Sequence, residues 1–489
     1  MDHTRPDYPS FAKLFKARTV VLLLLALAPS LVSAELSRDR PNVILIILDD
    51  LNDWVGCLGG HPQTLTPNID RLAETGVLFR NAHAQAPICN PSRASFLTSL
   101  YPESTGIYFN SGSFEDAGVA SERLLTRRFE SSGYRVKGAG KIYHDNDGRY
   151  MVDHAGAFGG FGPLPAKKLT PFEGVRLWDW GALPVSDAEM PDHRIAEWAS
   201  RELRRPREAP LFLAVGFYRP HVPLYAPQRW FTRLPEATVA LPDVRAGDLD
   251  DISRYAVDVT RLEHIEPTHE WIVAHQQWQR LVQSYLACIQ FADEQVGRIL
   301  RAVETGDYRD NTYIVLFGDH GFHLGEKGGV WGKQTLWEES TRVPLIIAGP
   351  GIPAGRVSTK PVQLLDVLPT LLELSGLPPG QPMDGRSLVS LLRNPDADWP
   401  HVARTSFGPG NVAIRSERYR YVRYKDGSEE FYDHQFDPHE WENRILDPAL
   451  APFIAAHRAQ LPQTARPIVG AGSTGHKAYA AAEQPTAQP

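Results

Sequence analysis

Apolar runs alternate along the chain with segments that have helical spacing. Three runs are strongly apolar, and the first of them is also rich in β-branched residues, which is typical of strands buried on both faces. They are NVILIILDD (42–50), APLFLAVGF (209–217) and NTYIVLFGD (311–319). Two further strands are predicted in YRVKGAG (134–140) and VPLIIAGPG (343–351).

Apolar residues at helical spacing predict helices between these strands. The predicted helices are residues 68–76, a helix that begins near Pro91, residues 121–133, a long stretch within 275–304, and a helix within 362–376. Since proline favours the first turn of a helix, Cys89 should lie just outside the helix that begins near Pro91. Strands that alternate with helices predict an α/β fold with a mostly parallel sheet covered on both faces.

The pattern changes after about residue 398. Polar and apolar residues alternate through 411–438 around the turn Lys425-Asp426-Gly427, which predicts an antiparallel hairpin. We therefore expect a main domain over residues 35–398 and a small subdomain over 399–464, with a helix near 446–461. The Ala-, Gly-, Gln- and Pro-rich tail, residues 465–489, is expected to be disordered.

The first 34 residues have the pattern of a secretory signal. Lys13, Lys16 and Arg18 precede the apolar run TVVLLLLALA, which is too short to span a bilayer. Val32 and Ala34 are small residues in the positions that precede a cut, so we expect cleavage after Ala34. The mature protein should be periplasmic or secreted, without a stable membrane anchor. An uncleaved anchor is the alternative, because the charged segment is unusually long.

Charge and cysteine content narrow the function. The 489 residues carry a net charge of −7, from 51 basic and 58 acidic residues, and no basic cluster marks a nucleic-acid partner. The three cysteines make no disulfide framework. Cys57 and Cys288 lie in apolar contexts and should be buried core residues. Cys89 is flanked instead by polar residues and turn formers, which asks for another explanation.

Polar and charged side chains follow four of the predicted strands where each strand ends. In open α/β sheets, functional sites form just outside the carboxyl ends of the strands. The residues delivered to this edge are Asp49, Asp50, Lys141, His144, His221, Asp319, His320 and Lys333. The helix that begins near Pro91 adds Cys89 and Arg93.

This set of side chains favours one kind of chemistry. Each member alone has an ordinary explanation as a turn, cap or solvated residue. Together, three carboxylates repel one another unless a cation neutralises them, and oxygen ligands suit Ca²⁺ or Mg²⁺. The lysines, arginine and histidines then need an anion, for which a tetrahedral oxyanion is suitable. The sequence therefore predicts hydrolysis of a phosphate or sulfate ester.

CNPSR (89–93) resembles the sulfatase signature Cys-x-Pro-Ser-Arg, whose cysteine is oxidised to Cα-formylglycine by a maturation enzyme. The motifs LDD, GKIYH, RPH, DHG and WGK occur along the chain in the order that family shows. The resemblance covers roughly residues 40–445. Around DDLNDWVGCLGG, TPNIDRLA, LGEKGG and EESTRVPLII, the chain is most similar to members of the iduronate-2-sulfatase type. The resemblance implies an alkaline-phosphatase-like α/β fold with a small C-terminal antiparallel subdomain, and a sulfated saccharide or other sulfate ester as substrate.

The resemblance also implies roles for individual residues. One divalent cation per subunit, Ca²⁺ in the first place, would be held by the modified Cys89 together with Asp49, Asp50, Asp319 and His320. Formylglycine hydrates to a gem-diol, which Arg93 and Lys141 would hold and Asp319 would deprotonate for attack on sulfur. Lys141, His221 and Lys333 would contact the sulfate, with His221 or Lys333 protonating the leaving alcohol. His144 would then deprotonate the second hydroxyl, so that sulfate is eliminated and the aldehyde is restored.

Two departures from the family pattern leave alternatives open. The signature usually continues Leu-Thr-Gly, whereas this chain has Leu97-Thr98-Ser99. The common Asp-Asn pair is here Asp319-His320, and imidazole is a softer ligand than Ca²⁺ usually takes, so Mn²⁺ or Zn²⁺ stays open. The Asp-His pair also occurs in related phosphonate monoester and phosphodiester hydrolases, which are the main alternative. A catalytically silent protein that binds sulfated glycans is a third.

Substrate contacts are the least determined part of the site. Five residues beside the catalytic motifs are candidates for lining a sugar pocket: Trp54, Asn110, Arg219, His323 and Trp331. Both tryptophans could equally be core residues.

Overall fold

The computed structural model describes Met1 and residues 40–144, 147–206, 209–260 and 265–482. Apart from Met1, the predicted signal peptide lies outside the described residues. Within the described part of the chain, no helix has both the length and the apolar character needed to cross a bilayer.

An eight-stranded sheet forms the centre of the molecule, in the order β11-β2-β10-β7-β1-β5-β3 with β12 beside β2. β10 runs antiparallel to both of its neighbours, and the other pairs are parallel. This confirms the predicted mostly parallel sheet. Its strands are β1 (Asn42–Leu48), β2 (Val77–His83), β3 (Arg135–Gly140), β5 (Leu211–Phe217), β7 (Thr312–Gly318), β10 (Arg342–Ala348), β11 (Arg356–Ser358) and β12 (Val362–Gln363).

β1 shows why the sheet is covered on both faces. All seven of its residues are buried. Alternate side chains point to opposite faces, so Ile44, Ile46 and Leu48 join one hydrophobic cluster. Val43, Leu45 and Ile47 join the other. A strand with two buried faces needs a continuous apolar sequence, as this one has.

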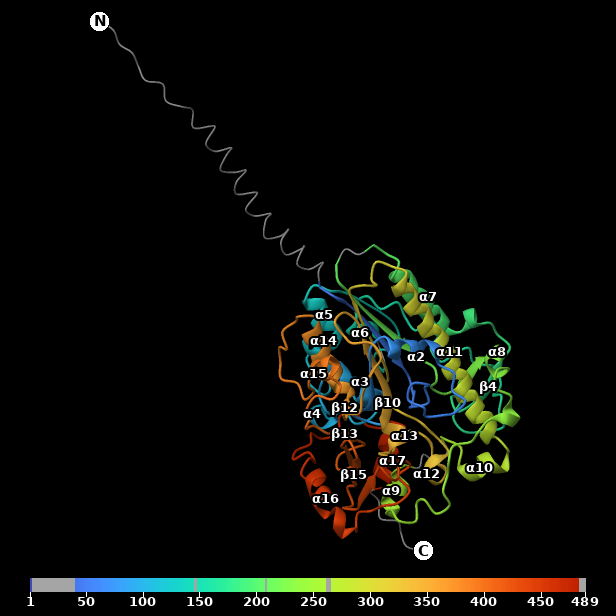
Figure 1. Ribbon diagram of the computed structural model, residues 1–489. Helices are drawn as coiled ribbons and strands as arrows, with labels where there is room; N and C mark the ends of the chain where they lie inside the picture. The colour runs from blue at the N-terminus through green and yellow to red at the C-terminus, as the bar shows by residue number, and fades with distance from the viewer. Residues whose placement is uncertain (2–39, 145–146, 207–208, 261–264, 483–489) are drawn as a thin grey trace.

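Helices cover the two faces in separate layers (Figure 1). One layer holds α2 (Pro67–Glu74), α7 (Pro191–Glu202) and the long α11 (Trp278–Glu304). The other holds α3 (Cys89–Thr98), α5 (Leu125–Ser131), α14 (Val367–Leu374) and α15 (Val389–Arg393). The four other helices predicted in the main domain are present, within a few residues of their expected ends.

A second, antiparallel sheet follows α15 in the lower part of the view in Figure 1. It contains β13 (Ala403–Ser406), β14 (Val412–Arg415), β15 (Tyr419–Arg423) and β16 (Glu429–Asp433), and α16 (Ala451–Arg458) packs against it. The predicted turn at Lys425–Gly427 joins β15 to β16, so the hairpin is confirmed. The predicted α/β fold with a small antiparallel sheet near the C-terminus is the observed one.

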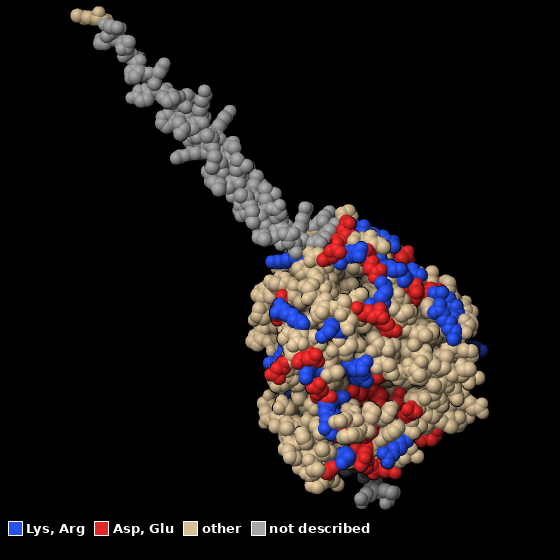
Figure 2. Space-filling model, viewed as in Figure 1, with Lys and Arg blue, Asp and Glu red and all other residues tan. Residues whose placement is uncertain are grey.

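Short elements connect these layers. They are α4 (Pro102–Thr105), α6 (Asp147–Tyr150), β4 (Trp180–Leu183), β6 (Leu224–Pro227), α8 (Gln228–Phe231), α9 (Arg254–Val259), α10 (His269–Ala274), β8 (His323–Leu324), α12 (Glu326–Gly329), β9 (Trp331–Gly332), α13 (Glu338–Thr341) and α17 (Thr474–Ala482). On the face drawn in Figure 2, basic and acidic side chains are interspersed, in keeping with the small net charge of −7.

The expectation of a disordered tail is wrong for residues 465–482. Backbone N–H groups of Arg466 and Val469 donate to the carbonyls of Glu103 (2.9 Å) and Gly106 (2.8 Å). In α17, Tyr479 is 2% exposed and its ring lies 5.5 Å from that of Phe109. The low-complexity composition hid this contact, because one aromatic residue is enough to anchor a small-residue helix to a packed surface.

We expect Tyr479→Ala to lower the free energy of unfolding by about 3 kcal/mol, since it removes a buried aromatic ring. Thermal and urea unfolding of the full chain measure this change. Tyr479→Phe is the matched control: it keeps the ring and loses only the hydroxyl, which donates to the Pro409 carbonyl at 2.8 Å. Unchanged stability of Tyr479→Ala would show that α17 contributes little to the fold.

Candidate active site

The carboxyl ends of β1, β3, β5 and β7 bring the predicted residues together. Leu48 at the end of β1 pairs with Phe217 of β5 and with Gly318 of β7, and Gly140 of β3 pairs with Gly216. Because these strands are parallel and end at the same level, the residues that follow them meet at one edge. They are Asp49, Asp50, Lys141, His221, Asp319 and His320.

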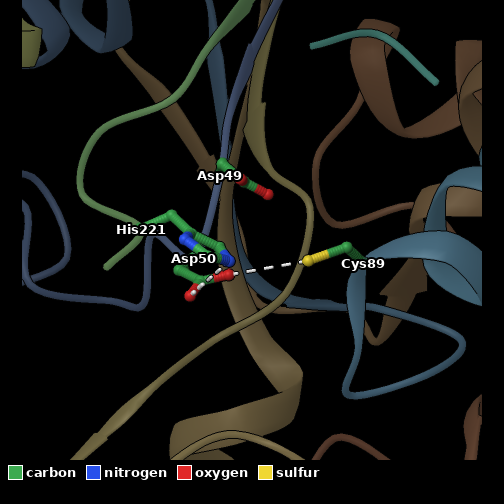
Figure 3. Close-up of side chains that lie close together, drawn as sticks. All are labelled: Asp49, Asp50, Cys89 and His221. Atoms are coloured by element: carbon green, nitrogen blue, oxygen red, sulfur yellow. Dashed lines mark hydrogen bonds and ion pairs between the residues drawn. The ribbon is translucent and has the colours of Figure 1, made fainter. Parts of the chain in front are cut away.

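Asp50 is held in an unusual backbone conformation. Its φ is 62°, in the left-handed region that aspartate tolerates better than most residues. Its N–H donates to Asp319 Oδ1 at 3.0 Å, and its carbonyl accepts from the Tyr285 hydroxyl at 2.7 Å. These bonds hold the strained residue in place, and the strain turns the Asp50 carboxylate toward the same space as that of Asp49 (Figure 3).

Cys89 lies at the N-terminus of α3. The helix begins at Cys89 itself, with Ile88 as the extended residue before it, so the cysteine is inside the first turn rather than just outside it. The positive end of the helix dipole therefore faces the centre. The Ser92 hydroxyl donates to the Asp319 carbonyl and ties this first turn to the end of β7.

Ser99 explains one departure from the sulfatase signature. It follows α3 in a left-handed conformation with φ 57° and ψ 38°, where glycine is the usual residue. The Ser99 hydroxyl donates to the Leu365 carbonyl at 2.8 Å and accepts from the Gly385 N–H at 3.2 Å. These two bonds stabilise a conformation that costs serine about 1 kcal/mol.

Arg93 joins two of the carboxylates. It is 1% exposed, and its guanidinium lies 3.0 Å from Asp49 Oδ1 and 2.8 Å from Asp319 Oδ2. It also donates to the carbonyls of Lys141 (2.5 Å) and Ile142 (3.1 Å). A planar group with five donors is suited to this bridging position, which fixes the strand ends relative to one another.

The thiol of Cys89 lies among cationic side chains. Lys333 Nζ is 3.1 Å from its Sγ and 2.7 Å from Asp50 Oδ1. His320 Nε2 is 3.3 Å from the same sulfur, and Asp50 Oδ1 is 3.9 Å away (Figure 3). Lys141 Nζ lies 2.6 Å from Asp49 Oδ2.

This arrangement shifts the pKa values of the centre. Burial raises the pKa of the Cys89 thiol, but Lys141, Lys333, His320 and a hydrogen bond to His144 outweigh it and hold the pKa well below its usual value. Burial raises the pKa of Asp319 to about 6, against the lowering effect of His320 and Arg93. Such perturbed groups in one place are typical of a functional site.

The described residues fit a divalent cation. Ligand atoms of Asp49, Cys89, Asp319 and His320 lie within 4.8 Å of one another, and all four residues are buried. Asp50 Oδ2 is buried and has no hydrogen-bond partner among the described residues. The Nδ1 of His320 lies 2.9 Å from the Gly321 carbonyl, which can only accept, so Nδ1 carries a proton there, while Nε2 faces Cys89 and Asp50 and would be the atom to bind a cation. The predicted metal-ligand set is therefore brought together.

A cavity of about 700 Å³ opens beside this centre. Cys89, Lys141, His144, His221 and Lys333 line it. The Nδ1 of His221 lies 2.5 Å from the Val222 carbonyl, and its Nε2 lies 3.8 Å from Asp50 Oδ2. All predicted catalytic residues are thus at the cavity or directly behind it.

Of the five residues predicted to contact the substrate, one lines the cavity. Asn110 lines the cavity, but Trp54, Arg219, His323 and Trp331 are absent from its described lining. All four are at most 4% exposed. They sit beside catalytic motifs in sequence, yet their side chains are packed inside the protein.

Each of these four residues makes contacts elsewhere in the protein. Trp54 packs on His61 and Tyr285, and the Arg219 guanidinium donates to the carbonyls of Tyr225 and Phe161. His323 Nε2 hydrogen-bonds the Thr335 hydroxyl at 2.8 Å, and burial lowers its pKa to about 3. Trp331 stacks on His269 and borders a separate cavity of about 280 Å³.

The sequence missed several cavity residues. Phe161 lies in a glycine-rich loop, yet its ring centre is 5.3 Å from Lys141 Nζ and 4.6 Å from the His221 ring. Trp178, His154 and Glu266 also line the cavity. The spacing of these residues carries no signal, because they reach the cavity from separate loops.

Comparison with known proteins agrees with this geometry. The sulfatase family profile matches residues 41–377, and a profile for the C-terminal part of N-sulphoglucosamine sulphohydrolase matches residues 325–466. A sulfatase of Formosa agariphila is 39% identical over 444 residues, 87% of each chain. Human iduronate 2-sulfatase is 32% identical over 403 residues, 72% of each chain.

A solved structure shares the fold. The phosphonate monoester hydrolase of Agrobacterium radiobacter superimposes with a TM-score of 0.71 at 22% identity, covering 86% of this chain and 94% of that one. The family profile and the relatives, together with the assembled centre, support sulfuric ester hydrolysis. The chain belongs to the sulfatase family.

Proposed function

We propose that this protein is an exported sulfatase that releases sulfate from a sulfated saccharide. Its nucleophile is formylglycine made from Cys89 by a maturation enzyme, and its cofactor is one divalent cation, Ca²⁺ in the first place. The observation that carries the proposal is the position of Cys89 Sγ, within 3.1 Å of Lys333 and 3.3 Å of His320 beside buried carboxylates. The sulfur marks the place that the oxygens of the modified side chain would take.

Asp49, Asp50, Asp319 and His320 would hold the cation, with the modified residue 89 as a further ligand. When bound, the cation supplies a Lewis acid that stabilises negative charge on the ester oxygens. The modified side chain supplies a hydrated aldehyde, which allows sulfate to leave by elimination.

The chain's own residues provide orientation, charge and proton transfer. Lys141 and Lys333 line the cavity and offer ammonium groups to the sulfate oxygens. Asp319, with its pKa raised to about 6, is placed to accept a proton from the nucleophile. His221 Nδ1 donates to the Val222 carbonyl, so a doubly protonated His221 would give its Nε2 proton to the departing alcohol, a role Lys333 could share. His144, at the cavity wall, would accept the last proton.

Phosphonate monoester or phosphodiester hydrolysis is the second candidate, favoured by the His320 imidazole in the ligand set. A cavity with two lysines at its centre accepts sulfate and phosphorus oxyanions alike. The relatives named above favour sulfate.

Maturation and substrate class are tested together on protein purified from its native host. We expect the tryptic peptide 81–93 to weigh about 18 Da less than the unmodified thiol peptide, because the thiol becomes an aldehyde. The same sample should begin at Glu35, and it should hydrolyse saccharide sulfates faster than matched phosphonate and phosphate esters. An unmodified thiol in a host that has the maturation enzyme would contradict the proposed mechanism. Faster phosphonate hydrolysis would favour the second candidate.

A further inference from the structure

Glu266 is an acidic group in the cavity that the proposed chemistry does not use. The described lining of the cavity contains two lysines, Lys141 and Lys333, and one carboxylic acid, Glu266. The two lysines are paired with Asp49 (2.6 Å) and Asp50 (2.7 Å). Glu266 is therefore the charged group of the lining whose role is unexplained.

The position of the Glu266 carboxyl is set by Gly332. This glycine has a φ of 81°, and a Cβ built on it would lie 2.5 Å from Glu266 Oε1. A residue with a side chain would displace the carboxyl, so glycine makes the room for it. The carboxyl consequently lies against the residue that precedes Lys333, and Glu266 lines both this cavity and the neighbouring one of about 280 Å³.

No hydrogen bond or ion pair within the described residues involves the carboxyl of Glu266, which is half-buried at the cavity wall. Burial raises its pKa well above the usual value, Asp50 adds to this, and Lys333 opposes it. The carboxyl is therefore open to a hydrogen-bond donor that enters the cavity. A bound ligand that brings a donor would satisfy it.

The wall beyond the centre is mostly apolar. It includes Phe161, Val175, Leu177, Trp178 and Ile265. Flat aromatic and apolar surfaces suit the C–H face of a sugar ring, whose hydroxyls then project to the sides. Glu266 is the carboxyl group of the described lining that such a projecting group could meet.

We propose that Glu266 is a specificity-determining residue that accepts a hydrogen bond from a hydroxyl or ammonium group on the alcohol part of the ester. It selects neutral or amino sugars over sugars that carry a carboxylate, because a hydroxyl or ammonium donor stabilises the ionised form of Glu266, whereas a second carboxylate beside it disfavours that form. This inference rests on the proposed function for the identity of the ligand as a saccharide sulfate.

Binding tests the inference without turnover. Cys89→Ala serves as the background, and calorimetry measures the dissociation constants of three monosaccharide sulfates esterified at the same ring carbon: a hexose, a hexosamine with a free amine, and a hexuronic acid. We expect the hexose and hexosamine esters to bind about tenfold more tightly than the uronate. Adding Glu266→Gln should weaken binding of the hexosamine ester about tenfold. The difference between its dissociation constant and that of the uronate ester should become smaller. If Glu266→Gln weakens binding of the hexosamine ester more than that of the hexose ester, the donor is an ammonium group. If it weakens both equally, the donor is a hydroxyl.

Glu270→Gln is the matched control, because Glu270 borders the neighbouring 280 Å³ cavity and is absent from the described lining of this one. It should leave all three constants unchanged. A uronate that binds as tightly as the hexosamine ester, or a Glu266→Gln effect no larger than that of Glu270→Gln, overturns the inference. If Glu266→Gln folds poorly, the inference is still tested by the Cys89→Ala protein with Glu266 intact. That protein must bind the hexosamine ester more tightly than the uronate.

Sulfate release by the mature wild-type enzyme tests the proposed function separately. A protein that binds the hexosamine ester selectively but releases no sulfate from any ester contradicts the proposed function and leaves the inference standing. A protein that hydrolyses all three esters equally, with Glu266→Gln indistinguishable from wild type in KM and kcat, contradicts the inference alone.

Discussion

Cys89→Ala should lower kcat/KM for sulfate release by on the order of 10⁴-fold or more, the scale seen when an enzyme's nucleophile is removed. The reason is chemical rather than structural. Alanine fills most of the space of the buried thiol, but it cannot become an aldehyde and leaves the lysines around the sulfate with no nucleophile to orient.

Ion chromatography of released sulfate measures this loss, on mature protein from a host that carries the maturation enzyme. Cys57→Ser is the control: it removes another free cysteine, half-buried and remote from the cavity lining, and should keep wild-type activity. Thermal unfolding should show Cys89→Ala to be folded. Retention of more than about a tenth of the activity would exclude residue 89 as the nucleophile.

Asp50→Asn should abolish binding of the cation and lower kcat/KM by about 10³-fold. Asp50 Oδ1 lies 2.7 Å from Lys333 and 3.3 Å from His320, while its Oδ2 is buried without a hydrogen-bond partner. The amide is a weaker metal ligand and no longer pairs with Lys333, so that cation binding and the position of the lysine are lost together.

Metal analysis of the purified protein measures the first effect and steady-state kinetics the second. We expect about one divalent ion per wild-type chain, and the analysis also identifies the metal. Asp53→Asn is the matched control, three residues further along the chain, where the carboxylate pairs with Arg342 at 3.0 Å outside the centre. It should keep both metal and activity. An Asp50→Asn variant with a full complement of metal would show that Asp50 is not a ligand.

Most of the catalytic centre was predictable because it sits where strands end. A continuous apolar run identifies a buried parallel strand, and the residue after such a run must lie at the carboxyl edge of the sheet. Asp49 and Asp319 directly follow strands of this kind, His221 comes shortly after a third, and Lys141 directly follows the less apolar β3. Their convergence needed no knowledge of loop geometry.

Substrate contacts were not predictable in the same way. Trp54 and Trp331 lie beside catalytic motifs in sequence, yet both pack into the protein, whereas Phe161 and Trp178 reach the cavity from loops. A loop residue can turn toward the cavity or toward the core, and only the packing of its neighbours decides which. The tail was misjudged for a related reason, since the packing of Tyr479 depends on a surface formed by distant residues.

The sequence by itself determined the layered α/β fold, the edge at which the site lies, and the charged groups that meet there, because periodicity and strand ends are local properties of the chain. The tertiary structure alone decided how those groups pair, with Arg93 between Asp49 and Asp319 and Lys333 between Asp50 and Cys89. It also decided that Glu266 faces the cavity with Gly332 making room for it. Such contacts join residues far apart in sequence, and their distances follow from the packing of whole elements rather than from any local pattern.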